Sequence, residues 1–374
     1  MKKNILKKIV IFYPSFERGG VEIILLNLIN FFLKKKIEIV LITSNIKKNI
    51  FKNSRFQSRI IKKNFSLIMP DRISKAFTAS NILFKELKRS NNKNTIVFSL
   101  QGSSLAILVS KFLGFKIIVR NAEDAVASTI FAENKFQSLI ILFLKIFLYN
   151  FSDKIISNSK GSGNSLKKIF IKKKKIFPIY NPYLKKVNKN INIKRYEYLL
   201  SVGRLTKQKD FNNLIISFSL IKDKIPNYKL IIIGDGHLKN ELQNLIEILH
   251  LKKRVLLKGW KNNLKKYYLN SKLFILNSLY EGFGNVLIDA INFDLPIITT
   301  NCKSGPNEII EYGKGGFLVP ISNPKLLSKK ILFCIKNYKL ALKKSLYAKK
   351  NIKRFDCETN CEKYFKLMLK TINE

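Results

Sequence analysis

Two carboxylates stand eight residues apart in the stretch SLYEGFGNVLIDA, residues 278–290. Glu281 comes before a turn of two glycines around an aromatic residue, and Asp289 follows in a segment with the apolar spacing of a helix. Retaining glycosidases need their two carboxylates about 5–5.5 Å apart, whereas eight residues of helix rise by about 12 Å. We therefore expect Glu281 and Asp289 to make two separate contacts with one elongated ligand.

The turn between these acids places backbone amides at the start of a predicted helix. Gly282, Phe283, Gly284 and Asn285 follow an apolar run that is typical of a strand. The first N–H groups of a helix have no partner within the helix, and they attract anions. This turn therefore predicts a contact with an anionic ligand.

A pair of cations occupies the loop SVGRLTKQKDF, residues 201–211. Arg204 and Lys209 flank the turn after another predicted strand, and together they would bind a diphosphate. Arg204 is the more informative of the two, because the chain has only ten arginines among its 70 basic residues. For Lys209 alone, a solvated lysine is the alternative.

Two further glycine turns connect predicted strands to helices. Gly19 and Gly20 lie in the loop SFERGGVE, residues 15–22, and Gly234 lies in the loop IIGDGHLKNEL, residues 232–242. Glycine allows the backbone to approach a ligand closely, and a helix start leaves amides for an anion. An ordinary chain reversal is the alternative for each turn.

Short apolar runs that alternate with helical segments must position these loops. Continuous runs of Ile and Val, without strict alternation, are typical of parallel strands covered on both faces. Such sheets bind ligands at the carboxyl ends of their strands. The predicted strands are residues 8–14, 37–43, 95–100, 116–120 and 153–159, then 198–203, 228–234, 254–259, 272–278, 296–300 and 316–320.

A chain of 374 residues is expected to form two domains. The segment FPIYNPYLKKVNKNINIKRYEY, residues 177–198, is rich in Pro, Asn and Lys and indicates a hinge. We predict an α/β fold of two Rossmann-like, doubly wound domains that face a cleft, with the last helix packed back on the first domain. The predicted parts are a first domain over residues 1–180, a linker over 181–198, a second domain over 199–355 and a terminal helix over 356–374.

The most apolar segment is LIILFLKIFLYNF, residues 139–151, and it is shorter than the roughly 20 residues that span a bilayer. We interpret it as a buried helix, with a helix at a membrane interface as the alternative. The basic start MKKNILKKIVIFYP, residues 1–14, has a short apolar run before Pro14, so it predicts a first strand and not a signal peptide. We expect a cytoplasmic protein.

The charge balance is strongly positive, with 70 Lys and Arg against 24 Asp and Glu and a formal net charge of +46. Abundant Asn, Ile and Phe accompany the lysines, a mixture that AT-rich codons produce. A basic chain can bind nucleic acid or an anionic membrane, but we find no nucleic-acid-binding motif. Four cysteines without CxxC spacing and two histidines argue against a metal site.

In combination, these motifs resemble the family 4 (group 1) retaining glycosyltransferases of the GT-B fold. The family's signature is a glutamate, a glycine–aromatic turn and a second acid eight residues later. This chain has EGFGNVLID, then DLPIIT, then NCKSGPNEII at residues 301–310. VGRLTKQKDF is similar to the family's donor-phosphate loop, and RGGVE is similar to its first glycine loop. The similarity is specific over residues 199–320.

The resemblance implies a nucleotide sugar as the bound donor. Arg204 and Lys209 would neutralise its diphosphate, Glu281 would hold hydroxyls of its sugar, and Asp289 would bind its ribose. Asp289 is one methylene shorter than the family's usual glutamate, which predicts a weaker or water-bridged ribose contact.

Glycines and amides would complete that donor site, again by resemblance. The amides of Phe283, Gly284 and Asn285 would lie near the sugar and the phosphate. Gly20 would sit against the diphosphate from the first domain.

The histidine that the family often carries at the end of a first-domain strand is missing here. That region is IIVRNAED, residues 117–124. Arg120, Asn121, Glu123 and Asp124 are the candidates to orient the acceptor, with Glu123 as a candidate helper base.

The implied reaction moves a sugar from a UDP-hexose or UDP-N-acetylhexosamine to an acceptor hydroxyl with retention of configuration, and it requires no cofactor. The acceptor would be a lipid-linked or polysaccharide glycan of the cell envelope. The lysine runs Lys34–Lys36 and Lys172–Lys175 would attract the anionic inner face of the membrane. The alternatives are a polyanion- or nucleic-acid-binding protein, a nucleotide-sugar epimerase and a sugar phosphorylase.

Overall fold

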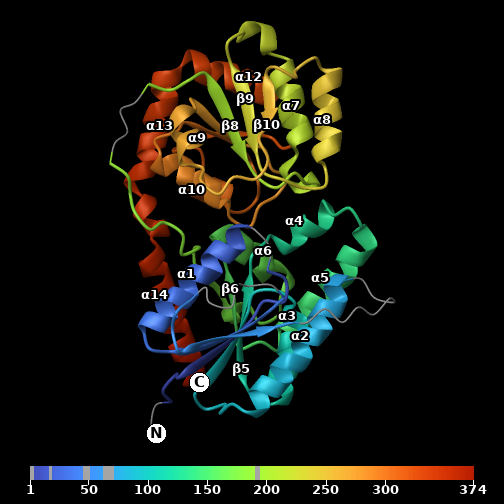
Figure 1. Ribbon diagram of the computed structural model, residues 1–374, viewed down its shortest axis with the longest axis vertical. Coiled ribbons are helices and arrows are strands. Elements are labelled where there is room, and N and C mark those ends of the chain that lie inside the picture. Colours follow the sequence, from blue (N-terminus) through green and yellow to red (C-terminus); the bar gives the residue numbers. More distant parts are fainter. Residues whose placement is uncertain (1–3, 17–18, 45–50, 62–70, 190–193) are drawn as a thin grey trace. The chain divides into compact units, whose positions relative to one another are not determined.

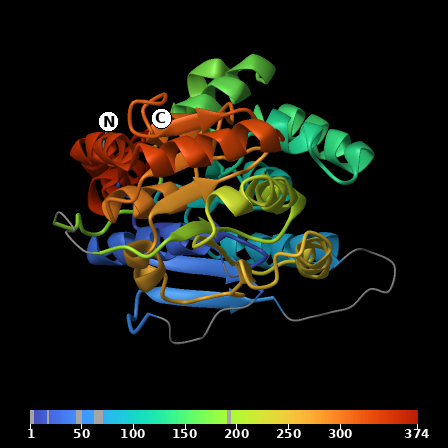
Figure 2. The ribbon, with the colours of Figure 1, turned by 90° about the horizontal axis from the view of Figure 1, so that it is seen from above.

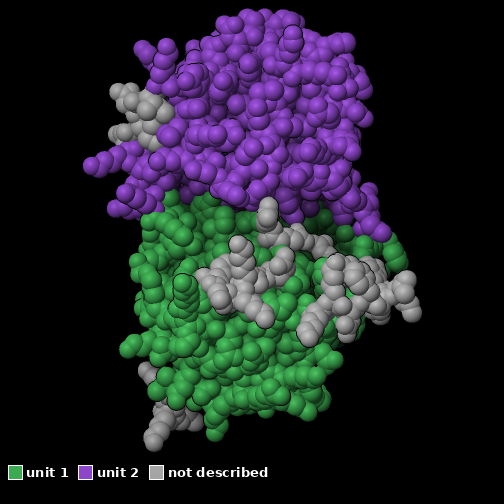
Figure 3. Space-filling model, in the orientation of Figure 1, with its two compact units in different colours: residues 1–129, 136–185, 355–374 green, residues 130–135, 186–354 purple. Residues whose placement is uncertain are grey.

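The computed structural model describes residues 4–16, 19–44, 51–61, 71–189 and 194–374. The chain divides into two compact units (Figure 3). Unit 1 comprises residues 1–129, 136–185 and 355–374, and unit 2 comprises residues 130–135 and 186–354. Each unit is built around its own parallel sheet, so the predicted fold of two doubly wound α/β domains is confirmed.

Unit 1 contains a seven-stranded sheet in the order β3-β2-β1-β4-β5-β6-β7 (Figure 1). Its strands are β1 (Lys8–Phe12), β2 (Glu38–Thr43), β3 (Phe56–Ile60), β4 (Thr95–Ser99), β5 (Lys116–Asn121), β6 (Lys154–Ser157) and β7 (Ile176–Pro178). Its helices are α1 (Gly20–Lys34), α2 (Asp71–Lys88), α3 (Ser103–Phe112), α4 (Ala125–Ile130), α5 (Lys135–Tyr149), α6 (Lys160–Ile169) and α14 (Cys357–Ile372).

Two apolar layers cover the faces of this sheet. Ile9 and Ile11 of β1 belong to the cluster that contains α1 and α14. Val10 and Phe12, which point to the other face, belong to the cluster that contains residues of α2, α3, α5 and α6. Burial on both faces explains the continuous Ile and Val runs of the sequence.

The last helix, α14, packs on unit 1, as predicted. Tyr364 and Met368 are fully buried in the layer shared with α1. The guanidinium of Arg120 on β5 donates a hydrogen bond of 3.2 Å from Nε to the Tyr364 hydroxyl. The chain end is therefore part of the core that supports the first sheet.

Unit 2 contains a six-stranded sheet in the order β10-β9-β8-β11-β12-β13. Its strands are β8 (Tyr198–Val202), β9 (Lys229–Ile233), β10 (Val255–Leu257), β11 (Leu273–Leu276), β12 (Ile297–Thr300) and β13 (Phe317–Val319). Its helices are α7 (Phe211–Ser219), α8 (Lys239–Ile248), α9 (Lys265–Asn270), α10 (Asn285–Asn292), α11 (Pro306–Ile309), α12 (Pro324–Lys336) and α13 (Tyr338–Lys350). The strand order reverses between β8 and β11, which is where ligands bind in such sheets.

Two strands were not predicted, and both lie at the edges of the first sheet. β3 has the sequence FQSRI, and only its first residue is buried. β7 has three residues and ends at Pro178, inside the segment that we interpreted as a hinge. Edge strands carry weak apolar patterns because only part of their surface is covered.

The interpretation of residues 139–151 as a buried helix is wrong. They lie in α5 and just beyond it, where only Leu148 and Tyr149 of the helix are buried. The remaining apolar side chains of this helix are partly or largely exposed to water. Within the described residues, no helix is both long and apolar enough to cross a membrane.

Candidate functional site

The strand order of unit 2 brings the loops after β8 and β11 together. Residues 203–210 leave one strand and residues 277–284 leave its neighbour, at the same edge of the sheet. Leu279 N donates to Gln208 O at 2.8 Å, and Gln208 Nε2 donates to Tyr280 O at 3.0 Å. These hydrogen bonds hold the two predicted ligand-binding loops side by side.

Lys209 and Glu281 form an ion pair between these loops. Glu281 Oε1 accepts hydrogen bonds from the Lys209 ammonium and, at 2.7 Å, from the Ser278 hydroxyl. The side chains of Lys209 and Glu281 are only 14% and 8% exposed. The backbone oxygen of Glu281 accepts a further bond of 2.6 Å from the Ser304 hydroxyl. A carboxylate held on several sides in this way has a fixed orientation.

Arg204 adds a second cation to the same loop. Its side chain is exposed, and in the described part of the chain its guanidinium has no hydrogen-bond or ion-pair partner. The side chain of Lys209 runs back along Gly203, because a Cβ on Gly203 would lie 3.1 Å from Lys209 Cδ. Arg204, Lys209 and Glu281 therefore belong to one loop cluster.

Gly234 allows the loop after β9 to contact this cluster. Its φ is +145°, and an added Cβ would lie 1.8 Å from the backbone oxygen of Gly203. Gly203 N also donates to Ile233 O at 2.9 Å. The glycine is therefore required by close backbone packing beside Arg204, which the sequence alone did not distinguish from a simple chain reversal.

The glycine–aromatic turn leads into α10 as predicted. Gly284 is the N-cap residue of α10, with φ +99°, and Asn285 is the first residue of the helix. The side chain of Phe283 is buried, and Gly282 is buried as well. Asn285 and Asp289 are half-buried on α10.

Gly19 and Gly20 lie in unit 1 at the start of α1. Gly19 is the N-cap residue with φ −175°, an extended conformation open to any residue, and Gly20 begins the helix. A Cβ on Gly19 would lie 3.1 Å from the carboxylate of Glu22. Residues 17–18 of the same loop lie outside the described residues.

The acceptor candidates after β5 differ in their environments. Glu123 is exposed, whereas Arg120 is buried and donates to Asn181 Oδ1 at 2.6 Å. Asp124 Oδ1 accepts the amides that begin α4, with 3.1 Å to Val126 N. Arg120 and Asp124 therefore have structural partners, and Glu123 is the exposed carboxylate of this segment.

Several residues of the loop cluster were not singled out from the sequence. Ser278 and Ser304 bond to Glu281, and Asn277 Nδ2 donates to Asp210 O at 2.7 Å. Gly305 has φ +77°, and its Cβ would lie 2.4 Å from the backbone oxygen of Phe283. The only sequence signal for Ser304 and Gly305 was their place in the SGPNEII motif.

Burial shifts two titrating groups of this region. It raises the pKa of the Asp210 carboxyl from 3.8 to about 6, with a small opposing effect from the Ser322 hydroxyl. It raises the pKa of the Cys302 thiol to about 12. Cys302 therefore remains a neutral thiol near neutral pH and is a poor nucleophile.

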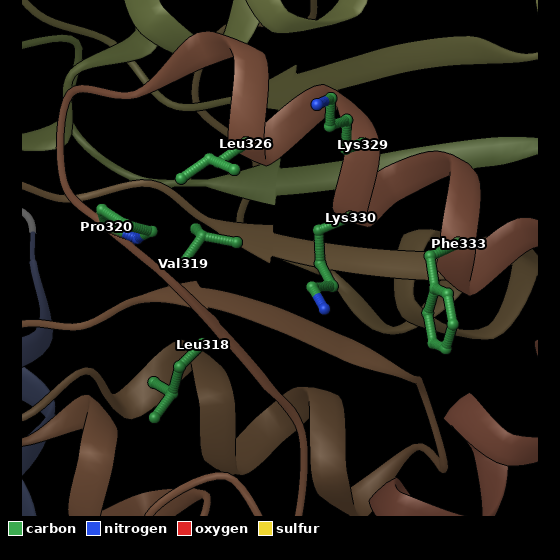
Figure 4. A pocket seen from close by; sticks show the side chains of 7 residues that line it. All are labelled: Leu318, Val319, Pro320, Leu326, Lys329, Lys330 and Phe333. Atoms are coloured by element: carbon green, nitrogen blue, oxygen red, sulfur yellow. The ribbon is translucent and has the colours of Figure 1, made fainter.

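A shallow cavity of about 390 Å³ lies between the end of β13 and α12 (Figure 4). It is lined by Leu318, Val319, Pro320, Leu326, Lys329, Lys330 and Phe333. These side chains include no hydrogen-bond acceptor, so they do not match the hydroxyls of a sugar. Elsewhere too, among the residues that the structure describes, no group of three His, Cys, Asp or Glu side chains could hold a metal ion.

Residues 185–353 match the family model described as glycosyl transferases group 1. In this region the chain is similar to the group 1 glycosyltransferases. The matched region contains all of the loop cluster described above, with Arg204, Lys209 and Glu281. The resemblance to group 1 glycosyltransferases that the sequence motifs indicated is confirmed for these residues.

Relatives of this chain include an uncharacterized glycosyltransferase, MJ1059, of Methanocaldococcus jannaschii. It is 39% identical over 48% of this chain and 47% of its own length. The N-acetylgalactosamine-N,N'-diacetylbacillosaminyl-diphospho-undecaprenol 4-alpha-N-acetylgalactosaminyltransferase of Campylobacter jejuni is 34% identical over 64% of this chain and 66% of its length. The matches thus span about half to two thirds of these proteins.

The fold of the chain is similar to that of solved GT-B enzymes. The Anabaena protein Alr3699/HepE, solved in complex with UDP and glucose, superposes with a TM-score of 0.75. The superposition covers 97% of this chain and 99% of that chain at 17% identity. The chain therefore has the GT-B fold over almost its whole length.

Proposed function

We propose that this protein is a glycosyltransferase that moves a sugar from a UDP-sugar to a hydroxyl of a lipid-linked glycan in cell-envelope synthesis, with retention of configuration at the anomeric carbon. The observation that carries the proposal is the buried Lys209–Glu281 pair beside the exposed Arg204. The Campylobacter relative is named for a diphospho-undecaprenol acceptor, and the Anabaena structure contains UDP and glucose.

The donor would rearrange the ion pair of the free protein. Lys209 compensates the buried charge of Glu281, which would otherwise be costly. A bound diphosphate would compete for the Lys209 ammonium and recruit Arg204. Glu281 would then accept hydrogen bonds from hydroxyls of the sugar in the position that Ser278 and Ser304 hold. Asp289 would contact the ribose, and the amides of Gly284 and Asn285 would lie near the phosphate.

Bond changes in the proposed reaction need no protein nucleophile. The bond between the anomeric carbon and the diphosphate oxygen breaks, and the acceptor oxygen bonds to that carbon on the same face. The leaving diphosphate takes the proton of the acceptor hydroxyl. Arg204 and Lys209 stabilise the charge that develops on the leaving group. No cofactor is required in this scheme.

Two experiments on the full chain test the proposal. The first identifies the nucleotide of the donor, and the second tests the role of Glu281. In a thermal-shift panel of UDP-, GDP- and ADP-sugars, we expect a UDP-sugar to give the largest stabilisation. Glu281→Gln keeps the shape of the side chain but loses the charge that pairs with Lys209. We expect it to lower the sugar-transfer rate by about 10³-fold or more.

A matched control removes one exposed acid elsewhere in unit 2. Asp223→Asn changes the net charge equally and should transfer sugar at the wild-type rate. Both variants should bind heparin as the wild type does, because that binding depends on overall charge. Full sugar transfer by Glu281→Gln would show that the site is assigned wrongly.

A further inference from the structure

Helix α5 faces water with large apolar side chains. Phe136 is 76% exposed and Phe143 is 69% exposed, and the helix buries only Leu148 and Tyr149 near its end. Seven large apolar side chains of α5 are exposed, one of them Ile141. We name as the apolar stripe the other six, Phe136, Leu139, Ile140, Phe143, Leu144 and Phe147. Monomeric soluble proteins rarely expose an apolar surface of this extent without a partner.

The spacing of the apolar stripe makes it one continuous surface. Its members follow one another at intervals of three, one, three, one and three residues, which places them on one side of a helix. Helices of globular proteins normally turn such a stripe toward the core. In both views of the molecule, α5 lies at the outside of unit 1 (Figure 1 and Figure 2).

Positive charge gathers at the C-terminal end of the apolar stripe. Lys175 Nζ donates to Asn150 O at 3.3 Å and to Ser152 O at 2.7 Å, which ties the Lys172–Lys175 run to this end of α5. Lys172 to Lys174 are exposed, and the neighbouring Ile171 is exposed as well.

Within the described residues, Lys172 to Lys174 have no carboxylate in an ion pair with them. The only charged residues of α5 are Lys135 and Lys145. Asp153, which follows the helix, is already paired with Lys111 at 2.5 Å and with Lys116 at 3.6 Å. Glu133, which precedes the helix, lies 3.2 Å from His237. The surface around the apolar stripe therefore combines exposed aromatic and aliphatic side chains with an excess of cations.

We propose that α5 and the adjacent Lys172–Lys174 dock on an anionic lipid bilayer, with the apolar stripe at the boundary of the acyl chains and the lysines on the headgroup phosphates. A 15-residue helix is about 22 Å long, which suits a helix that lies in the interface. This inference is linked to the proposed function, because docking would bring the enzyme to an acceptor that is held in the membrane. Lipid binding can nevertheless be measured without sugar transfer.

The second lysine run, Lys34–Lys36, belongs to a different surface. It ends α1, which packs in the layer of Ile9 and Ile11, whereas α5 packs in the layer of Val10 and Phe12 on the other face of the sheet. Lys35 is also paired with Glu362 of α14 at 3.0 Å. Lys34 and Lys36 therefore provide a control with the same charge and a different location.

A second copy of this chain is a poorer occupant of the apolar stripe. Dimerisation through α5 would bring two chains of net charge +46 together at their lysine-rich ends. An anionic bilayer satisfies both the apolar side chains and the cations, because each lysine near such a surface adds attraction.

The test measures binding of the full chain to vesicles of phosphatidylcholine with and without phosphatidylglycerol. We expect wild-type protein to bind the anionic vesicles and to be released by salt. Phe136→Ser with Phe143→Ser should weaken this binding by about tenfold or more. The control Ile248→Ser with Tyr312→Ser removes two equally exposed side chains of unit 2 and should leave binding unchanged.

The lysine arm of the test uses matched pairs. Lys172→Gln with Lys174→Gln should weaken binding to anionic vesicles by about tenfold or more, whereas Lys34→Gln with Lys36→Gln should have a much smaller effect. In a Trp260→Phe background, a tryptophan placed by Phe143→Trp should shift its emission to the blue on anionic vesicles. Lipids brominated on their acyl chains should quench this emission.

Several outcomes would overturn the proposal. Equal binding of wild type and Phe136→Ser with Phe143→Ser would do so, as would equal binding to neutral and anionic vesicles. A wild-type dimer that these two substitutions convert to monomer would identify a second copy as the occupant. Glu281→Gln should bind vesicles normally, so a failed sugar-transfer test and a failed docking test give different results.

Discussion

At the scale of single residues, the carboxylate of Glu281 is held in place before any ligand arrives. The Ser278 hydroxyl, the Lys209 ammonium and the Ser304 contact to its backbone fix its position. A group oriented in advance loses little conformational freedom when it binds a ligand. Its pairing with Lys209 also explains how a buried acid is tolerated in the free protein.

Gly234 is the residue at which a single methyl group should disturb the loop cluster most. Gly234→Ala would place a Cβ within 1.8 Å of Gly203 O at a φ of +145°. We expect a loss of about 3 kcal/mol or more in the stability of unit 2, because backbone must move to relieve the clash. Urea unfolding followed by hydrogen exchange in the β8 and β9 peptides measures this loss.

Gly259 provides the control for this substitution. It also has a positive φ, of +64°, but a Cβ there would have no neighbour within 4 Å. Gly259→Ala should therefore lower the stability of unit 2 by only about 1–2 kcal/mol, the cost of a side chain in a left-handed backbone conformation. Equal losses for the two variants would contradict the close contact between the loops after β8 and β9.

Asp210 should make stability depend on pH. Burial raises the pKa of its carboxyl from 3.8 to about 6, so the folded protein binds more protons than the unfolded chain between about pH 4 and pH 6. The contribution of Asp210 to stability therefore falls as the pH rises through this window, and then stays constant at its lower value.

Asp210→Asn removes this ionisation. We expect the variant to be more stable than wild type by about 1–2 kcal/mol at pH 8, and equally stable at pH 4, where both side chains are neutral. Urea unfolding at the two pH values checks the difference. A stability difference that is the same at pH 4 and pH 8 would show that ionisation of Asp210 is not its cause.

At the scale of elements, α14 is a chain end that serves as part of the core of unit 1. Met368→Ala would remove a fully buried side chain between α14 and its neighbours and should cost about 2–4 kcal/mol. We expect faster hydrogen exchange in the peptides of β4 and β5, which α14 contacts. Lys366→Ala, on the exposed side of the same helix, should leave exchange unchanged.

The strands and helices themselves follow closely from the sequence patterns. Residues 95–100 and 272–278 were predicted as strands, and β4 and β11 lie within them. Their continuous apolar runs were informative because the strands are covered on both faces. The edge strands β3 and β7 were missed because their patterns are short and partly polar.

At the scale of the whole molecule, the charge of +46 is spread over a chain with two α/β units. The total alone does not separate a nucleic-acid-binding protein from an enzyme. What separates them is the loop cluster of unit 2, where scarce acids and an arginine are placed together. The lysine runs likewise acquire different meanings, since Lys172–Lys175 adjoins the apolar stripe and Lys34–Lys36 does not.

The sequence by itself indicated the resemblance to group 1 glycosyltransferases, the parallel sheets and the loops that contain Arg204, Lys209 and Glu281. Those conclusions depend on local patterns and motif spacing, which are written along the chain. Only the tertiary structure decided that Lys209 pairs with Glu281 and that Gly234 packs against Gly203. It also showed that α5 is exposed. The sequence could not show this, because an apolar helix has the same composition whether the rest of the protein or another partner covers it. Contacts between distant segments depend on strand order and packing, which no local pattern encodes.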